Sequence, residues 1–280
     1  MTTEIVRQGR SVMSWVGGKS LLAEKIIPLI PDHKCYCEVF AGAAWVLFKK
    51  SESKAEVIND INVDLVTLYR VIQHHLEEFV RCFKWVLVSR DEFERMKRVD
   101  ASTLTDIQRA ARFYYLIRTR FSSNLNSPSM GVSTHRGPRL NLLRIEEELS
   151  AAHLRLAGVY VENLPFEKLI DRYDRPHTFF YIDPPYYGCE NHYGKGLFKR
   201  TDFDALAARL ARAKGKFILS INDTPEVRKL FARFEVREVM TRYTVGNAHK
   251  DRAVKELLFM NFRPGSARPR PAGRPALRRP

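Results

Sequence analysis

The sequence Asp183-Pro184-Pro185-Tyr186 follows an apolar, β-prone run at residues 178–182, and it constrains the fold more than any other feature of the chain. The run predicts a buried strand that ends where the carboxylate begins. Two consecutive prolines fix φ at about −65° and remove two backbone donors. The carbonyl oxygens of Asp183 and Pro184 are therefore expected to stay outside the hydrogen-bond ladder of a sheet or helix.

This strand end has two interpretations. Asp-Pro-Pro is a common way to end a strand and turn the chain. The same residues also offer a side-chain acceptor, carbonyl acceptors and an aromatic ring. Together these groups suit the exocyclic amine of a planar base better than a phosphate or a metal. The motif alone leaves a turn and an active site open.

Length and composition are typical of a globular protein. The chain has 280 residues, 45% of them hydrophobic, which suffices for one domain with an insertion or for two small domains. No apolar stretch reaches about eighteen residues, and the N-terminus lacks a signal-peptide pattern. We therefore expect a cytoplasmic protein with no membrane partner. The four cysteines form no C-x-x-C pair and no matched His cluster, so neither a zinc site nor a disulfide framework is expected.

The net charge of +15 favours polyanionic partners. Six of these charges are arginines of a Pro/Ala/Gly-rich tail at residues 263–280, which is expected to be disordered. Between Ile107 and Ile145 there is no acidic residue, while seven arginines accumulate there: Arg109, Arg112, Arg118, Arg120, Arg136, Arg139 and Arg144. We take this acid-free segment as a candidate nucleic-acid surface, although a run of charges also occurs on ordinary solvated faces.

Alternating strand and helix patterns surround a region without strand signals. Strands are expected at residues 35–40, 55–58, 159–162, 178–182 and 217–221, and a pair of strands at 239–245 and 256–262. Helices are expected at residues 20–30, within 63–88, and at 104–118 and 202–213. The simplest assembly is an α/β sheet domain from residues 1–64 and 158–262, with a helical, loop-containing insertion at 65–157 and the tail at 263–280.

Two further segments could bind a nucleoside. Small residues at 41–44 follow the first strand, where a nucleoside must approach the backbone, and Asp60 ends the next strand, where a carboxylate can bind ribose hydroxyls. Tight packing of strand on helix also accounts for the small residues, because the G-x-G-x-x-G pattern is incomplete. Gly18-Lys19-Ser20 does not complete a P-loop, since Met13 stands where that motif needs glycine.

Together these segments resemble the Dam-like (D12 class) adenine-N6 DNA methyltransferases, which use S-adenosylmethionine. The similarity covers most of residues 12–262. The segments that resemble family motifs are Trp15 to Lys19, Glu38 to Gly42, Asn59 to Tyr69, Asp183 to Tyr186, Ser220 to Thr224 and Lys255 to Leu258. Their order and spacing favour the active-site interpretation of Asp183. Ala44 replaces a second loop glycine of the family; its methyl group either narrows the cofactor pocket or lies harmlessly in the first turn of a helix.

The resemblance implies a Rossmann-like methyltransferase sheet domain with a helical target-recognition insertion. It implies S-adenosylmethionine as the cofactor and double-stranded DNA as the partner, with no metal and no obligatory protein partner. The catalytic residues are then Asp183, Pro184, Pro185 and Tyr186, and the cofactor-binding residues are Trp15, Lys19, Phe40, Gly42, Asp60 and Asp183. From the acid-free segment the candidate DNA contacts are Arg118, Arg120, Ser123, Asn124, Asn126, His135, Arg136 and Arg139.

The expected reaction is methyl transfer to the N6 amine of an adenine rotated out of the duplex, without a covalent intermediate. The Asp183 carboxylate and the Pro184 carbonyl would accept hydrogen bonds from N6, and these would strengthen as positive charge develops on nitrogen. Tyr186 would stack on the base. Methylation of cytosine N4, methylation of structured RNA, and a non-catalytic DNA-binding module with a vestigial cofactor fold are the alternatives; the target sequence is not predicted.

Overall fold

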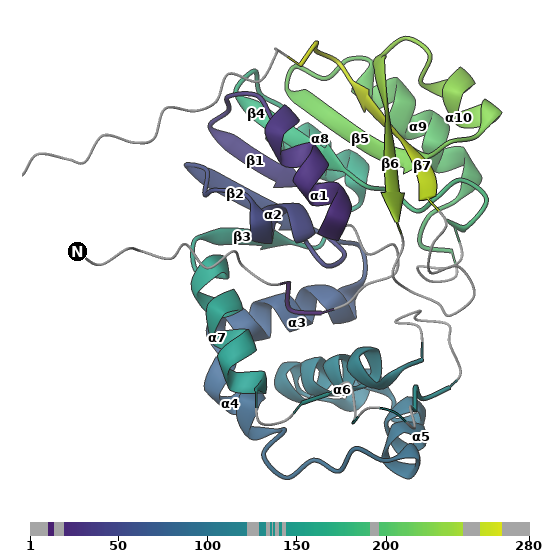
Figure 1. Ribbon diagram of the computed structural model, residues 1–280. Coiled ribbons are helices and arrows are strands. Elements are labelled where there is room, and N and C mark those ends of the chain that lie inside the picture. The colour runs from purple at the N-terminus through teal and green to yellow at the C-terminus, as the bar shows by residue number, and fades with distance from the viewer. Residues whose placement is uncertain are drawn as a thin grey trace, which may run out of the picture.

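A seven-stranded sheet in the order β3-β2-β1-β4-β5-β7-β6 forms the centre of the protein (Figure 1). The computed structural model describes residues 11–13, 20–121, 129–132, 135, 137, 140–141, 144–190, 196–242 and 253–264. The strands are β1 (Cys35–Glu38), β2 (Ala55–Asn59), β3 (Val159–Glu162), β4 (Thr178–Ile182), β5 (Lys216–Asn222), β6 (Glu235–Arg242) and β7 (Ala253–Met260). β7 lies between β5 and β6 and is antiparallel to both.

The parallel part of the sheet is Rossmann-like, as the sequence predicts. From β1 the chain builds outward through β2 to β3 and then returns to place β4 on the other side of β1. In sheets of this kind ligands bind at the carboxyl ends of the strands, where the strand order reverses. The carboxyl ends of β1 and β4 therefore mark the place where a site is expected.

Helices cover both faces of the sheet. One face packs against α1 (Ser20–Ile26), which continues into the 3-10 turn η1 (Ile27–Leu29), and against α2 (Trp45–Lys49) and α3 (Val63–His74). The other face packs against α8 (Phe166–Tyr173), α9 (Arg200–Leu210) and α10 (Pro225–Leu230). Successive strand residues point to opposite faces, so Tyr36 joins the first core and Cys37 the second.

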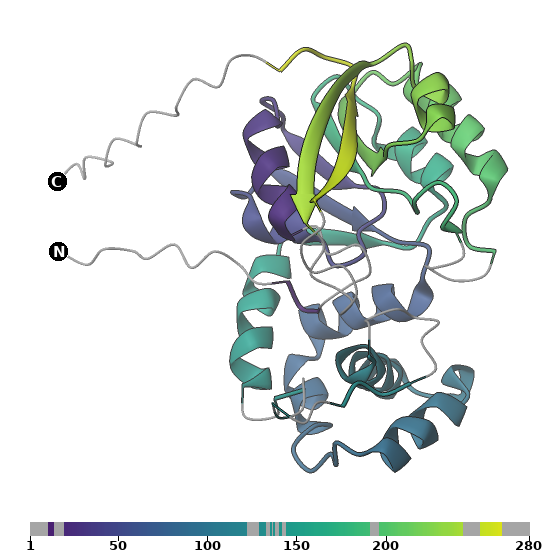
Figure 2. The same cartoon turned by 45° about the vertical axis from the view of Figure 1, so that its right-hand side comes forward.

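A helical region extends from the first face of the sheet and occupies the lower part of Figures 1 and 2. It consists of α4 (Leu76–Arg81), α5 (Arg90–Arg98), η2 (Ala101–Thr103), α6 (Asp106–Thr119) and α7 (Ile145–Leu156), together with α3. Side-chain caps fix several helix starts: Asn62 caps α3, and Thr105 and Gln108 form a capping box at α6. The core of this region is continuous with that first face. The predicted boundary at residues 64 and 65 falls in the first turn of α3, and the division into domains stays a prediction.

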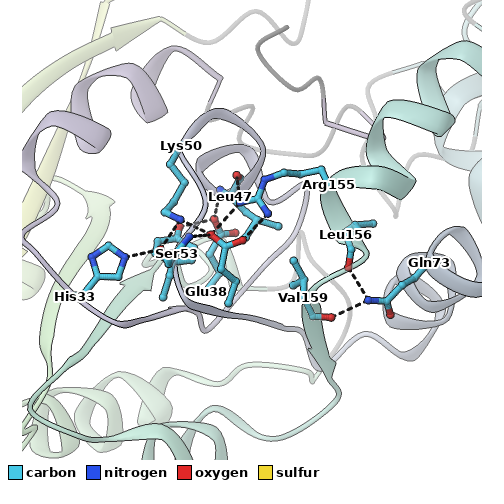
Figure 3. A network of polar contacts seen from close by, with 11 residues as sticks. His33, Glu38, Leu47, Lys50, Ser53, Gln73, Arg155, Leu156 and Val159 are labelled. Atoms are coloured by element: carbon cyan, nitrogen blue, oxygen red, sulfur yellow. Dashed lines mark hydrogen bonds and ion pairs between the residues drawn. The ribbon is translucent and has the colours of Figure 1, made fainter. Parts of the chain in front are cut away.

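A buried ion network fastens α7 to the sheet (Figure 3). Glu56 of β2 pairs with Lys50 and with Arg155 of α7, and all three side chains are largely buried. The Arg155 guanidinium also donates to the carbonyl oxygen of Leu47 in α2 at 2.9 Å. Beside it, the Gln73 amide donates to the carbonyl oxygens of Leu156 and Val159, at 2.6 and 2.8 Å. The helical region is thus held by polar bonds as well as by apolar packing.

Candidate active site

An open pocket with about 770 Å³ of empty space lies at the carboxyl ends of β1, β2 and β4. Its lining residues are Glu38, residues 40–46, residues 60–62, Tyr181, Asp183, Pro185, Leu197 and Phe198. Four predicted cofactor-binding residues, Phe40, Gly42, Asp60 and Asp183, therefore meet in one place. They come from three strand ends that are far apart in the sequence, and the pocket occupies the expected point of strand-order reversal.

The Asp183 carboxylate is held by side chains from two strands. Ser220 of β5 donates a hydrogen bond to Asp183 Oδ1 at 2.8 Å, and the Tyr181 hydroxyl lies 3.0 Å from Ser220 Oγ. Because the single proton of the serine goes to Asp183, the tyrosine is the donor to Ser220. Pro184 and Pro185 are buried directly after the strand. The carboxylate is thus oriented in the pocket wall before any ligand binds.

The rest of the D-P-P-Y loop is attached to β5 and β7. The amide group of Asn222 binds the backbone of Tyr187 on both sides, accepting from its N–H at 2.9 Å and donating to its carbonyl oxygen at 3.1 Å. The Tyr186 hydroxyl donates to Glu256 of β7. Tyr186 is half-buried, and it does not belong to the described residues that line the pocket. Its predicted stacking on a base stays a prediction.

Asp60 accepts hydrogen bonds from backbone donors. Gly42 N–H donates to Oδ2 at 3.0 Å, and Asn62 N–H donates to Oδ1 at 2.9 Å. Burial raises the pKa of the Asp60 carboxyl above its ordinary value, and the N–H donors of Asn62, Gly42 and Ile61 offset part of that rise. Each oxygen still has acceptor capacity, because a carboxylate offers about four lone-pair sites.

The turn at residues 41–44 is built on two left-handed positions, Gly42 at φ 48° and Ala44 at φ 50°. Its backbone is held by the Tyr69 hydroxyl, which donates to the Gly42 carbonyl oxygen at 2.7 Å. Ala44 is buried, lines the pocket and caps α2. The interpretation that this position lies in the first turn of the helix is wrong, because Ala44 precedes the helix in a conformation that costs a residue with a side chain about 1 kcal/mol.

Glu38 is a pocket residue whose role the sequence does not show. Its carboxyl Oε1 accepts from the Tyr36 hydroxyl at 2.6 Å and from Leu47 N–H at 2.7 Å, which fixes the start of α2. Burial raises the pKa of Glu38 to about 7; the bonds from Tyr36 and Leu47 oppose the rise, and the nearby Asp183 charge adds to it. Leu47 joins this residue to the ion network, since its carbonyl oxygen binds Arg155.

A mainly apolar hollow of about 240 Å³ adjoins the pocket. The two share Phe40, Ile61, Leu197 and Phe198. Phe40 contacts Phe198 edge to face, with ring centroids 5.7 Å apart. Ile61 falls within the Asn59 to Tyr69 segment that resembles a family motif, whereas no signal in the sequence distinguishes Leu197 and Phe198 from ordinary core residues.

The predicted DNA contacts are placed only in part. Five of them lie outside the described residues: Ser123, Asn124, Asn126, Arg136 and Arg139. The predicted cofactor-binding residues Trp15 and Lys19 also lie outside the described residues. His135 is exposed. Arg118 pairs with Glu148 at 3.3 Å, and Arg120 is half-buried, with burial and then Arg112 lowering the pKa of its guanidinium.

Other arginines of the acid-free segment are engaged within the protein. Arg109 pairs with Asp64, and Arg112 donates to the carbonyl oxygens of Met96 and Lys97. Their partners lie outside the segment, so the absence of acidic residues in the sequence does not leave these charges unpaired. The DNA-contact assignment stays a prediction.

Within the described part of the chain, no cluster of three or more His, Cys, Asp or Glu side chains could hold a metal ion. None of the described helices has the length and apolar character needed to cross a membrane.

The fold is a Rossmann-like sheet with an open pocket at the point where the strand order reverses. Residues 15–245 match the D12 class N6 adenine-specific DNA methyltransferases, and the chain belongs to this family. The type II methyltransferase M.CviBI of Paramecium bursaria Chlorella virus NC1A is 23% identical over 84% of this chain and 91% of its own. The DNA adenine methylase of Haemophilus influenzae is 26% identical over 89% and 92%. A crystallised rRNA methylase from Streptococcus thermophilus has a TM-score of 0.34 at 8% identity, over 86% of this chain and 94% of its own.

Proposed function

We propose that the chain transfers a methyl group from S-adenosylmethionine to the N6 amine of adenine in double-stranded DNA, on a base rotated out of the helix and without a covalent intermediate. The observation that carries the proposal is the single pocket lined by both Asp60, which follows β2, and Asp183, which follows β4. One carboxylate suits a nucleoside sugar and the other suits an amino group, with the small-residue turn between them.

The pocket residues fit the cofactor. The pocket is an open, mainly apolar concavity with a few polar groups, which is the usual character of small-molecule sites. Asp60 keeps acceptor capacity for two ribose hydroxyls, and Phe40, Ile61 and Leu197 supply apolar contacts for an adenine ring. Trp15 and Lys19 would complete the site. S-adenosylmethionine supplies an electrophilic methyl group on a positively charged sulfur.

Asp183 and Pro184 would act on the incoming amine. The lone pair of adenine N6 is delocalised into the ring, so the amine becomes a better nucleophile when its N–H groups are held by acceptors on one side. Ser220 orients Asp183 in advance, and an acceptor fixed in advance needs no reorganisation as charge develops on nitrogen. Alignment of the two reactants supplies a further part of the rate. No prior deprotonation is needed.

The base must leave the duplex, because a paired N6 cannot reach the pocket. Tyr186 would stack on the extruded base. The net charge of +15 favours binding of the phosphate backbone. Arg118, Arg120 and His135, with the polar residues between them in sequence, would supply phosphate or base-edge contacts.

Replacement of Asp183 tests the assignment. We expect Asp183→Ala to lower kcat by about 10³-fold, since one preorganised acceptor at the reacting centre is lost. Binding of DNA should persist. As a control, Asp171→Ala removes an exposed carboxylate of α8 that pairs with Arg209, and it should methylate normally.

Two results would contradict the assignment. Methylation by Asp183→Ala near the wild-type rate would remove the proposed role of that carboxylate. Failure of the wild-type protein to bind S-adenosylmethionine in equilibrium dialysis would favour a non-catalytic DNA-binding module.

A further inference from the structure

Glu256 is a buried carboxylate that the proposed reaction does not use. Its side chain is 0% exposed, in the middle of β7, paired in register with Asn222 of β5 and Val239 of β6. Burial of a carboxylate in a sheet costs free energy unless strong hydrogen bonds compensate. An apolar residue would serve the core better, so the carboxylate at this position requires a specific partner.

One such partner is the Tyr186 hydroxyl, which donates to Glu256 Oε1. Fixing the backbone and the phenolic oxygen sets the first side-chain torsion of Tyr186. Because a phenolic O–H prefers the plane of its ring, the direction to the Glu256 acceptor then favours one plane of the ring. The backbone end is held as well, because Asn222 binds both polar groups of the next residue, Tyr187. The ring of Tyr186 is therefore clamped by two neighbouring residues of the β5–β7 pair.

The same strand pair holds the carboxylate that would accept the amine. Ser220 lies two residues before Asn222 on β5, so both side chains point to one face of the sheet. Ser220 binds Asp183, and Asn222 and Glu256 bind Tyr187 and Tyr186. The β5–β7 strand pair thus holds both Asp183, the predicted amine acceptor, and Tyr186, the predicted stacking ring.

We propose that Glu256 is a positioning residue: through the Tyr186 hydroxyl it sets the plane in which an extruded base stacks, and hence the direction of its amino group toward Asp183. The inference rests on the proposed function, since it concerns the same base. Hydrogen-bonded side chains that lock the rotamer of a binding group preserve the geometry that catalysis needs. The carboxylate is also a stronger acceptor than a neutral group would be.

The chain offers a matched control. The Tyr173 hydroxyl of α8 donates to Glu162 Oε1 of β3 at 2.7 Å. This is the same pair of groups, with the glutamate on the same sheet, and neither residue lines the pocket. Tyr173→Phe removes a tyrosine–glutamate hydrogen bond without touching the proposed stacking platform.

The test compares Tyr186→Phe, Glu256→Ala, the double variant, Glu256→Gln and Tyr173→Phe. We expect Tyr186→Phe and Glu256→Ala each to lower kcat by about tenfold or more, because a hydrogen bond to a charged group is lost. The double variant should lose no more than the worse single variant, since both remove one interaction. Glu256→Gln keeps an acceptor oxygen and should retain most of the activity. Tyr173→Phe should match the wild type.

Two further measurements separate positioning from general damage. S-adenosylmethionine affinity should stay within about twofold in every variant. In a duplex with 2-aminopurine at an adenine methylated by the wild type, Tyr186→Phe and Glu256→Ala should alter the fluorescence of the extruded base, whereas Tyr173→Phe should not. Tyr186→Phe keeps the ring of a half-buried residue and so provides a folded variant even if Glu256→Ala does not fold.

The proposal is wrong if Tyr186→Phe keeps the wild-type kcat, if the losses of the two single variants multiply in the double variant, or if Tyr173→Phe loses as much as Tyr186→Phe. These results leave the proposed function intact as long as the wild type methylates adenine and Asp183→Ala does not. A wild type that does not methylate DNA would instead remove the proposed function itself.

Discussion

Two carboxylates at opposite ends of β2 have opposite surroundings. Glu56, near the start of the strand, is surrounded by Lys50 and Arg155; burial alone would raise its pKa, but these two cations outweigh burial and lower it. Asp60, just past the end, forms no ion pair with any described Lys or Arg, and burial raises its pKa. The two cations neutralise Glu56 within the fold. In the described part of the chain, Asp60 accepts hydrogen bonds only from backbone N–H groups.

The difference separates a structural use of charge from a use in binding. Glu56 accepts from Lys50 and Arg155 and also from the backbone N–H of Ser53, so it stabilises the frame and has little capacity left for a ligand. A carboxylate held by N–H groups at a pocket wall is oriented and keeps lone pairs for a hydroxyl or an amine. If this distinction holds, stability and cofactor affinity should respond to different residues of the same strand.

The largest expected effect is the loss of stability when Glu56 is replaced. Glu56→Gln leaves Lys50 and Arg155 buried without their counter-charge, so the free energy of unfolding should fall by about 3–5 kcal/mol. Urea unfolding measures this, and Glu52→Gln at an exposed neighbouring position is the control. The distinction between a structural and a binding carboxylate is wrong if the folded Glu56→Gln protein loses cofactor affinity while its stability stays unchanged.

Glu38 gives the next largest effect, as a dependence on pH. Its pKa of about 7 lies above its ordinary value of 4.5, so between these pH values the folded state binds more protons than the unfolded state. The stability of the wild type relative to Glu38→Gln should therefore fall by about 3 kcal/mol as pH rises from about 4.5 to about 7, and level off above. Parallel pH profiles for the two proteins would show that folding does not raise the pKa of Glu38.

Asp60→Asn tests the role of the second carboxylate in cofactor binding. The amide cannot accept at both positions, so we expect S-adenosylmethionine affinity to fall by about tenfold, or about 1.4 kcal/mol. The free energy of unfolding should fall by about 1–3 kcal/mol, less than for Glu56→Gln, because one backbone N–H loses its acceptor but no counter-charge is left unpaired. Titration calorimetry beside urea unfolding distinguishes the two quantities, with exposed Asp32→Asn as the control. A large loss of stability with unchanged affinity would assign Asp60 to the frame.

The smallest effect is expected at Ala44. Glycine adopts φ 50° without strain, but it also gains freedom in the unfolded chain, so Ala44→Gly should raise the free energy of unfolding by only about 0.5 kcal/mol. Thermal unfolding measures the gain. A decrease would show that the buried methyl group contributes more through packing than its backbone conformation costs. An accompanying rise in cofactor affinity would show that the methyl group narrows the pocket.

The sequence predicts the strands and the Rossmann-like sheet, although the strand pair expected at 239–245 and 256–262 lies at 235–242 and 253–260. The family resemblance implies the meeting of Phe40, Gly42, Asp60 and Asp183, and the pocket at the strand ends brings them together. The sequence does not predict α5, α7, α8 or α10, which are short or polar outside a few buried positions. The bonds that hold the D-P-P-Y loop are also missed. Glu256 lies 70 residues from Tyr186, and only the register of β5 with β7 shows that they meet.

The arginines of the acid-free segment show a second limit of prediction from sequence. A segment without acidic residues suggests unpaired positive charge, yet Arg109 and Arg118 find carboxylates on α3 and α7. Charge pairing is a property of neighbours in space, which a local count along the sequence cannot supply.

The most direct measurement is the nucleoside composition of DNA from a host that lacks adenine methylation and expresses this chain. Hydrolysis and mass spectrometry should detect N6-methyldeoxyadenosine with the wild type and none with Asp183→Ala. Unmodified DNA with a folded, cofactor-binding wild type, or N4-methyldeoxycytidine as the product, would contradict the account.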